Sequence, residues 1–109
     1  MMRSVAIVLL VLGAGSQNAS AQPSAADRLA EGRRLFEQSC GVCHTKPTLA
    51  SGLYGPALSG ETMGGRADVM RDVIRNGTPR MPGFKHNFTP DQIDAIVAYL
   101  KTLPPTANR

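Results

Sequence analysis

Cys40-Gly41-Val42-Cys43-His44 is the stretch from which the rest of the chain can be interpreted. Two cysteines separated by two residues and followed at once by a histidine are typical of the covalent attachment of a c-type haem. The two thiols add to the two vinyl groups of the porphyrin, and the histidine is delivered to one axial position of the iron. The chain has no other cysteine. The motif therefore predicts one covalently bound haem c, attached to Cys40 and Cys43, with His44 as an iron ligand.

The alternative for this motif is a Cys-x-x-Cys redox disulfide of the thioredoxin type. That class of site expects a strand before the motif and a βαβ unit around it, and the flanking sequence shows neither. A redox disulfide would also leave His44 without a role. We therefore favour haem attachment.

The first 21 residues have the features of a secretory signal peptide. Arg3 supplies the positive charge, residues 5–12 are continuously apolar, and Ala19-Ser20-Ala21 is a cleavage site of the A-x-A type. The apolar run is too short to span a bilayer as a helix. No cysteine for a lipid anchor lies at the cleavage point, and no later stretch is apolar enough for a membrane span. We expect an exported, soluble chain of residues 22–109 in the periplasm, where the haem is attached.

Composition describes a small domain with a mildly basic surface. Removal of Arg3 leaves 11 Lys and Arg against 8 Asp and Glu, a net charge of +3, and two ionised haem propionates would lower it to about +1. The arginines alternate with acids and do not cluster beside aromatic residues, which argues against nucleic-acid binding. With three Phe, two Tyr and no Trp, the chain has little material for a core, and a haem would supply the missing apolar volume.

The first predicted helix begins after Ser24, a good N-cap residue, and runs to about Gln38. Asp27 in its first turn suits the helix dipole. Gly32 lies in the middle of this helix, where glycine costs about 1 kcal/mol relative to alanine. Either the glycine is simply tolerated, or another helix approaches closely there, which we favour.

Two further helices are predicted in the second half of the chain. Residues 66–76 have an apolar face and a charged face, and Gly77 follows as the terminating residue. The last helix starts at the capping box formed by Thr89 and Gln92, and its apolar spacing continues to Leu103, before two prolines. We expect it to cross the first helix near Gly32, with Phe36 and Tyr99 at the crossing. The apolar faces comprise Val69, Met70, Val73 and Ile74 in one helix, and Ile93, Ile96, Val97, Leu100 and Leu103 in the other.

The loop after the cysteine motif contains Gly55-Pro56-Ala57-Leu58. A metal-bound histidine usually donates its second ring N–H to a carbonyl or carboxylate, which fixes the ring. The carbonyl of Pro56 is a candidate acceptor, with Leu58 on the haem face. An ordinary surface turn is an equally good interpretation of these residues alone.

Met81 is the candidate for the second axial ligand. It lies between Pro79 and Pro82, and these fixed dihedral angles reduce the entropy lost when the loop orders around a weak thioether ligand. Met70 is better explained as part of an apolar helix face, and Met63 lies in a glycine-rich loop. His86 follows Lys85 in a polar turn and is interpreted as a surface residue.

Together these motifs resemble the class I, small monohaem c-type cytochromes, over essentially the whole mature chain. The resemblance implies an all-α cytochrome c fold, in which three to four helices wrap around one haem and the terminal helices cross at Gly32. It also implies that the Pro56 carbonyl orients His44 and that Met81 is the distal ligand. Residues 74–82 resemble bacterial members that work beside periplasmic dehydrogenases or terminal oxidases. The chain lacks the tryptophan that some members use to bind a propionate, for which Arg66, Arg75 and Arg80 are candidates.

The leading functional hypothesis is a monomeric one-electron carrier, not an enzyme, because both axial positions of the iron are filled. A dehydrogenase would donate the electron, and an oxidase or another cytochrome would accept it. Lys46, Lys85 and Arg80 are close in sequence to the iron ligands and could steer an acidic partner. One alternative is a subunit fixed to a dehydrogenase complex. Another is a haem sensor or catalyst in which Met81 is displaced.

Overall fold

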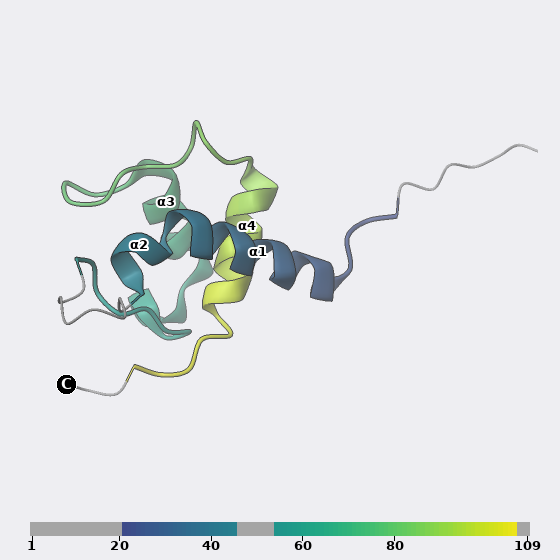
Figure 1. Ribbon diagram of the computed structural model, residues 1–109, viewed down its shortest axis with the longest axis horizontal. Helices are drawn as coiled ribbons and strands as arrows, with labels where there is room; N and C mark the ends of the chain where they lie inside the picture. Colours follow the sequence, from purple (N-terminus) through teal and green to yellow (C-terminus); the bar gives the residue numbers. More distant parts are fainter. Residues whose placement is uncertain (1–20, 46–53, 107–109) are drawn as a thin grey trace, which may run out of the picture.

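The computed structural model describes residues 21–45 and 54–106. The predicted signal segment before Ala21 and the predicted steering residue Lys46 lie outside the described residues. The described part contains four α-helices, labelled in Figure 1, and a short 3₁₀ helix, η1, at Thr62–Gly65. The α-helices are α1 (Ala25–Ser39), α2 (Gly41–His44), α3 (Ala67–Asn76) and α4 (Pro90–Leu100). Among these residues the only β pairing is an isolated bridge between Thr78 and Met81, so the predicted all-α class is confirmed.

Helix α1 begins where the sequence predicts. The Ser24 hydroxyl accepts the backbone N–H of Asp27 at 3.1 Å, and the Asp27 carboxylate accepts the backbone N–H of Ser24 at 3.1 Å. The Ser24 hydroxyl also donates to that carboxylate at 2.7 Å. These hydrogen bonds hold the pKa of Asp27 below its ordinary value. The box satisfies two backbone donors that a helix end leaves free.

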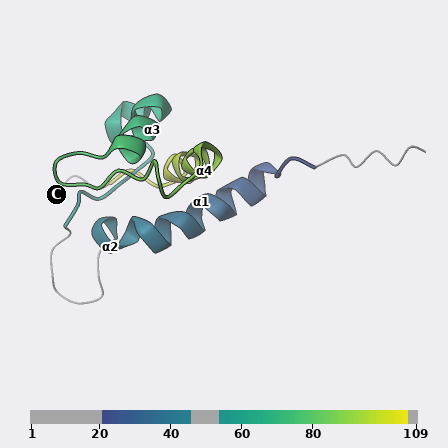
Figure 2. The ribbon, with the colours of Figure 1, turned by 90° about the horizontal axis from the view of Figure 1, so that it is seen from above.

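Helices α1 and α4 cross at Gly32, as predicted, and Figure 2 shows the two helices side by side. A methyl group at position 32 would lie 1.9 Å from the carbonyl oxygen of Ala95, so no side chain fits between the two backbones. Beside the crossing, the rings of Phe36 and Tyr99 pack with their centroids 5.5 Å apart. The glycine is therefore required by close helix approach.

Helix α3 packs against α4 and completes the core. An ion pair between Arg71 and Asp94 joins the two helices at their partly exposed edges. The Lys101 ammonium donates to the carbonyl of Gly65 at 2.9 Å, which ties the end of α4 to η1. The α3 helix ends at Gly77, whose φ of 73° is readily adopted by glycine. The buried apolar side chains include Leu35, Phe36, Met70, Ile74, Ile93, Ile96, Val97 and Leu100.

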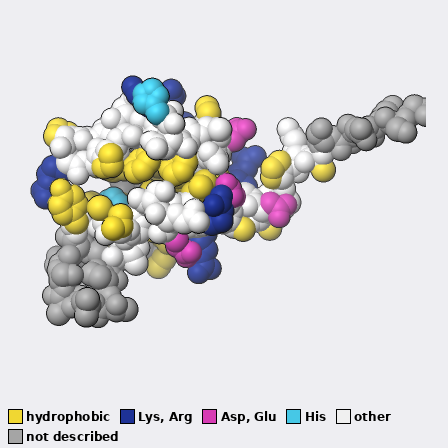
Figure 3. Space-filling model, turned by 45° about the horizontal axis from the view of Figure 1, so that its top comes forward, with side chains coloured by type: hydrophobic (Ala, Val, Ile, Leu, Met, Phe, Trp, Pro, Cys, Tyr) yellow, Lys and Arg dark blue, Asp and Glu magenta, His cyan; other side chains and the backbone are white. Residues whose placement is uncertain are grey.

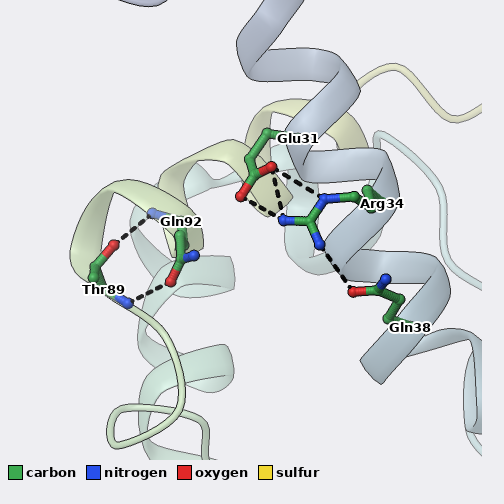
Figure 4. A network of polar contacts seen from close by, with 5 residues as sticks. All are labelled: Glu31, Arg34, Gln38, Thr89 and Gln92. Atoms are coloured by element: carbon green, nitrogen blue, oxygen red, sulfur yellow. Dashed lines mark hydrogen bonds and ion pairs between the residues drawn. The ribbon is translucent and has the colours of Figure 1, made fainter.

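Helix α4 starts as predicted but ends earlier than its apolar spacing suggests. Figure 4 shows the capping box, in which the Thr89 hydroxyl accepts the Gln92 N–H at 3.2 Å and the Gln92 amide oxygen accepts the Thr89 N–H at 3.0 Å. The helix ends at Leu100 and does not continue to Leu103. Beyond it the chain tightens into a turn in which the Leu103 N–H bonds the Leu100 carbonyl at 3.1 Å. The following proline disfavours helical geometry at Leu103, which still packs against the core from this turn.

The outer face of α1 carries exposed pairs of opposite charge. Arg34 bonds both Glu31, at 2.8 Å, and Gln38, at 3.1 Å (Figure 4). Arg33 pairs with Glu37 at 2.8 Å, which raises the pKa of Arg33. Such exposed pairs contribute little to stability. They confirm that basic residues of this helix are interleaved with acids and do not form a continuous basic patch.

We predict that Gly32→Ala destabilises the protein by about 1–3 kcal/mol, the usual cost of inserting atoms into a packed interior. The alanine must push apart the backbones of α1 and α4, and this outweighs its better helix propensity. The measurement is the free energy of unfolding of the haem-loaded protein in denaturant. Arg28→Ala, an exposed change in the same helix, is the matched control and should shift it by less than about 0.5 kcal/mol. Equal stability of the Gly32→Ala variant and the parent would show that the helices do not need this close approach.

Candidate functional site

A cavity of about 290 Å³ lies among the cysteine motif, the 54–58 segment, η1, α3 and the 78–82 loop. Figure 3 shows hydrophobic side chains gathered along a hollow on this side of the molecule. Within the described part of the chain, no carboxylate lines the cavity. Its walls therefore suit a large apolar group, as do most ligand cavities in proteins. The apolar wall residues include Leu58, Met70, Val73, Ile74 and Leu100.

The cysteine motif forms its own short helix, α2, which the sequence analysis did not separate from the loop. The backbone N–H of Cys43 bonds the Cys40 carbonyl at 3.1 Å, and the N–H of His44 bonds the same oxygen at 3.0 Å. This turn places Cys43 and His44 in the cavity wall and leaves Val42 82% exposed. Cys40 is buried directly before the turn. One helical turn thus presents the reactive residues to the cavity side.

The environment of Cys40 does not suit a redox dithiol. Burial, and to a smaller extent the charge of Cys43, raises the pKa of Cys40 to about 11. Reactive cysteines of redox motifs have lowered pKa values, because the thiolate is the attacking species. A free thiol at Cys40 would therefore stay protonated at neutral pH and would be a poor nucleophile for disulfide exchange. The two cysteines are not joined to each other.

The backbone of Gly55 and Pro56 positions the His44 ring. Its Nδ1 lies 2.7 Å from the carbonyl oxygen of Pro56. The sequence alone left open whether residues 55–58 provide this contact or form an ordinary surface turn, and the structure has the contact. In the tautomer that carries hydrogen on Nδ1, this atom donates to the carbonyl and Nε2 is left with a free lone pair. The Gly55 N–H bonds the Cys43 carbonyl at 2.8 Å. A methyl group at position 55 would lie 2.7 Å from Cε1 of His44, so glycine is what allows the ring to lie here.

Met81 lies in the cavity wall, on a turn fixed by its own backbone. The Thr78 N–H bonds the Met81 carbonyl at 2.9 Å, and the Met81 N–H bonds the Thr78 carbonyl at 3.1 Å. The Phe84 N–H bonds the Ile74 carbonyl at 2.9 Å and attaches the end of this loop to α3. The turn residues between the bridged pair are Pro79 and Arg80. The thioether is therefore presented by backbone that is already ordered.

The competing candidates for this position occupy different environments. Met70 is in the core and only 3% exposed, as predicted for a packing residue, although it also touches the cavity. Met63 lines the cavity from η1 and has a φ of 55°, a left-handed conformation that is costly for a residue with a side chain. His86 is exposed and is not among the lining residues. All three methionines line the cavity, so position in the wall does not choose between them. Met81 is distinguished from Met63 and Met70 by the turn that the Thr78–Met81 bridge closes.

Tyr54 and Thr62 are cavity residues that were not predicted from the sequence. The guanidinium carbon of Arg80 lies 5.8 Å from the centroid of the Tyr54 ring. Of the three arginines considered for a propionate, only Arg80 lines the cavity. Arg66 pairs with Asp68 at 2.8 Å. The only sequence signal for Tyr54 was its place directly before Gly55-Pro56, which gives no spacing pattern to recognise.

The donor set fits a covalently attached haem. The same cavity wall carries one thiol, an imidazole whose Nδ1 is engaged and whose Nε2 is available, and a thioether on a fixed loop. A second thiol is buried one helical turn away. The remaining wall is largely apolar, which suits the porphyrin plane. A redox disulfide, the alternative for the cysteine motif, would use only the two cysteines.

Comparison with known proteins agrees with this chemistry. Residues 27–100 match the family model described as cytochrome C oxidase, cbb3-type, subunit III. The chain is 31% identical, over 99 residues, to the 4-cresol dehydrogenase (hydroxylating) cytochrome c subunit of Pseudomonas putida, covering 90% of this chain and 82% of the relative. It is 38% identical, over 95 residues, to Cytochrome c55X of Paracoccus denitrificans, covering 85% and 89%. It is also 34% identical, over 108 residues, to the Dihydro-heme d1 dehydrogenase of Pseudomonas aeruginosa, but covers only 20% of that protein.

We predict that Cys40 and Cys43 are both joined to the haem as thioethers, so that neither reacts with iodoacetamide even after the purified protein is unfolded and reduced. Mass spectrometry should find the peptide that holds both residues heavier by one haem. A Cys40→Ala, Cys43→Ala variant controls for labelling of other side chains. Two alkylated sulfurs on a peptide of unmodified mass would contradict haem attachment and favour the dithiol.

Proposed function

Because the chain belongs to the family of small c-type cytochromes and transfers single electrons through a covalently bound haem c, we propose that His44 and Met81 hold its iron. We propose further that it works outside the cytoplasm, between exported redox proteins. The observation that carries the ligand assignment is that His44, at the end of α2, and Met81, on the 78–82 loop, line one cavity and are anchored by separate hydrogen bonds.

The proposed ligand arrangement gives each cavity residue a distinct task. Cys40 and Cys43 provide the two thioether attachments. The Pro56 carbonyl, 2.7 Å from Nδ1 of His44, keeps the ring oriented and makes Nε2 a stronger electron-pair donor to the iron. Leu58 lines the wall beside it and helps to exclude water. The bound haem supplies iron that alternates between the ferrous and ferric states.

Two features of the site favour the reduced state. A methionine axial ligand raises the reduction potential relative to a second histidine. The apolar wall, without carboxylates among the described residues, disfavours the additional positive charge of the oxidised iron. With His44 and Met81 as its two ligands, the bound iron would have no position open for a substrate. These features explain electron transfer without catalysis.

The proposed location rests on the N-terminal sequence. Residues 1–21 have a charged start, an apolar run and an A-x-A site, so that residues 22–109 would form the mature cytochrome domain. None of the helices in residues 21–45 and 54–106 is long and apolar enough to cross a membrane. We propose export to the periplasm, with haem attachment after export.

The proposed electron donor is an exported dehydrogenase, and the acceptor is an oxidase or another cytochrome. The relative from Pseudomonas putida, which is named as the cytochrome c subunit of a dehydrogenase, supports this donor class. It equally supports a second candidate, a subunit that stays bound to its dehydrogenase. Purification from the native host separates the two, since a fixed subunit elutes with a large partner and a monomeric carrier elutes alone.

We predict that Met81→Ala removes the sulfur-to-iron absorption band of the ferric protein at the red end of the spectrum and lowers the reduction potential. Met63→Leu and Met70→Leu are the matched controls, because both residues line the same cavity and both variants should keep the band. The parent spectrum should not change when carbon monoxide is added to the reduced protein. A band that survives in Met81→Ala but disappears in Met63→Leu would assign the ligand to Met63.

We predict that the mature protein begins at Gln22. N-terminal sequencing of haem-loaded protein from the periplasmic fraction measures this directly. Replacing Ala19 and Ala21 with arginine should block cleavage, because the site requires small residues. Haem-loaded protein that retains Met1 in the cytoplasmic fraction would contradict export.

A further inference from the structure

Two segments lie beside the proposed iron ligands, one contacting His44 and the other carrying Met81, and they are anchored by separate sets of backbone hydrogen bonds. The proximal segment, residues 54–58, is tied to α2 through the Gly55 N–H and the Cys43 carbonyl at 2.8 Å. The distal loop, residues 78–82, is closed by the bridge between Thr78 and Met81, and the residues after it are tied to the end of α3. Among the described residues, no backbone hydrogen bond joins the two segments to each other.

A side-chain contact does join them. The guanidinium of Arg80 lies over the ring of Tyr54, with its central carbon 5.8 Å from the ring centroid. This separation is within the range of a favourable cation–π interaction. Both side chains line the cavity, and Tyr54 is 66% exposed. The pair therefore lies where the cavity meets the solvent.

The sequence positions of the two residues connect this contact to both ligands. Arg80 directly precedes Met81 and follows Pro79, so its backbone is part of the fixed turn. Tyr54 directly precedes Gly55, in the segment whose Pro56 carbonyl contacts His44. Met81 can leave the iron through a movement of the distal loop away from the cavity. Such a movement would separate Arg80 from Tyr54.

We propose that Arg80 and Tyr54 form a bridge across the cavity mouth that retains the distal loop and slows the exchange of Met81 for external ligands. The two side chains are positioning residues for Met81 and do not bind the iron. This inference rests on the proposed ligand role of Met81. It concerns how the ligand is retained, which the ligand assignment alone does not specify.

The test measures the rate at which added imidazole displaces Met81 from the ferric haem-loaded protein at fixed ionic strength. The loss of the sulfur-to-iron absorption band reports this exchange. Tyr54→Leu and Arg80→Gln should each increase the rate about two- to fivefold, the range expected for loss of one exposed cation–π contact. The double variant should be no faster than the faster single variant, because both changes remove the same contact.

Two control variants separate the bridge from other effects. Tyr54→Phe keeps the aromatic face and should exchange at the parent rate. Arg75→Gln removes one exposed positive charge near the end of α3, at a residue that does not line the cavity, and should also match the parent. Denaturant midpoints are measured for all variants, and the bridge variants should retain the sulfur-to-iron band before imidazole is added.

The inference is overturned if Tyr54→Leu exchanges at the parent rate, or if the effects of the two single changes multiply in the double variant. An effect of Arg80→Gln alone would show that charge, and not the contact, controls exchange. Failure of imidazole to displace Met81 from any variant would also overturn it, since the bridge would then not limit exchange. Absence of the sulfur-to-iron band from the parent protein would instead refute the proposed ligand assignment.

Discussion

An apolar cavity inside a very small helical domain is the constraint on which the rest of this structure depends. Met70, Ile74 and Leu100 belong both to the buried core and to the cavity wall. Each of these side chains thus faces the core on one side and the cavity on another, and a domain of this size has little other core to compensate for an unfilled cavity. The covalently attached haem of this cytochrome family therefore serves both as the redox group and as the missing part of the interior.

The helices and loops can be understood as supports for that cavity. The crossing of α1 and α4 at Gly32 fixes the base from which the cysteine turn extends. Helix α3 supplies a wall, and its C-terminal end receives the backbone hydrogen bonds from the loop that carries Met81. The Pro56 carbonyl, in the 54–58 segment, contacts the His44 ring. The proposed ligands are thus held mainly by backbone geometry, which side-chain substitutions elsewhere disturb little.

Features set by local sequence could be predicted, and features set by contacts between distant segments mostly could not. Ser24 and Thr89 mark the starts of their helices because a capping box is complete within four residues. Gly32 could be interpreted because glycine is costly inside a helix, and close approach of a second helix offsets that cost. The end of α4 at Leu100 was predicted wrongly, because apolar spacing continues into a turn that Pro104 imposes. The contact between Arg80 and Tyr54 joins residues far apart in sequence, with no motif to reveal it.

The dependence of the fold on the haem can be tested by comparing far-ultraviolet circular dichroism of the haem-loaded protein and of a haem-free Cys40→Ala, Cys43→Ala chain. Both are measured over a temperature range in the same buffer. The account predicts that the haem-loaded protein is helical and melts cooperatively, whereas the haem-free chain has lost most of this helix and shows no cooperative transition. A haem-free chain with the same helix content and the same melting temperature would contradict it, because the cavity would then need no occupant.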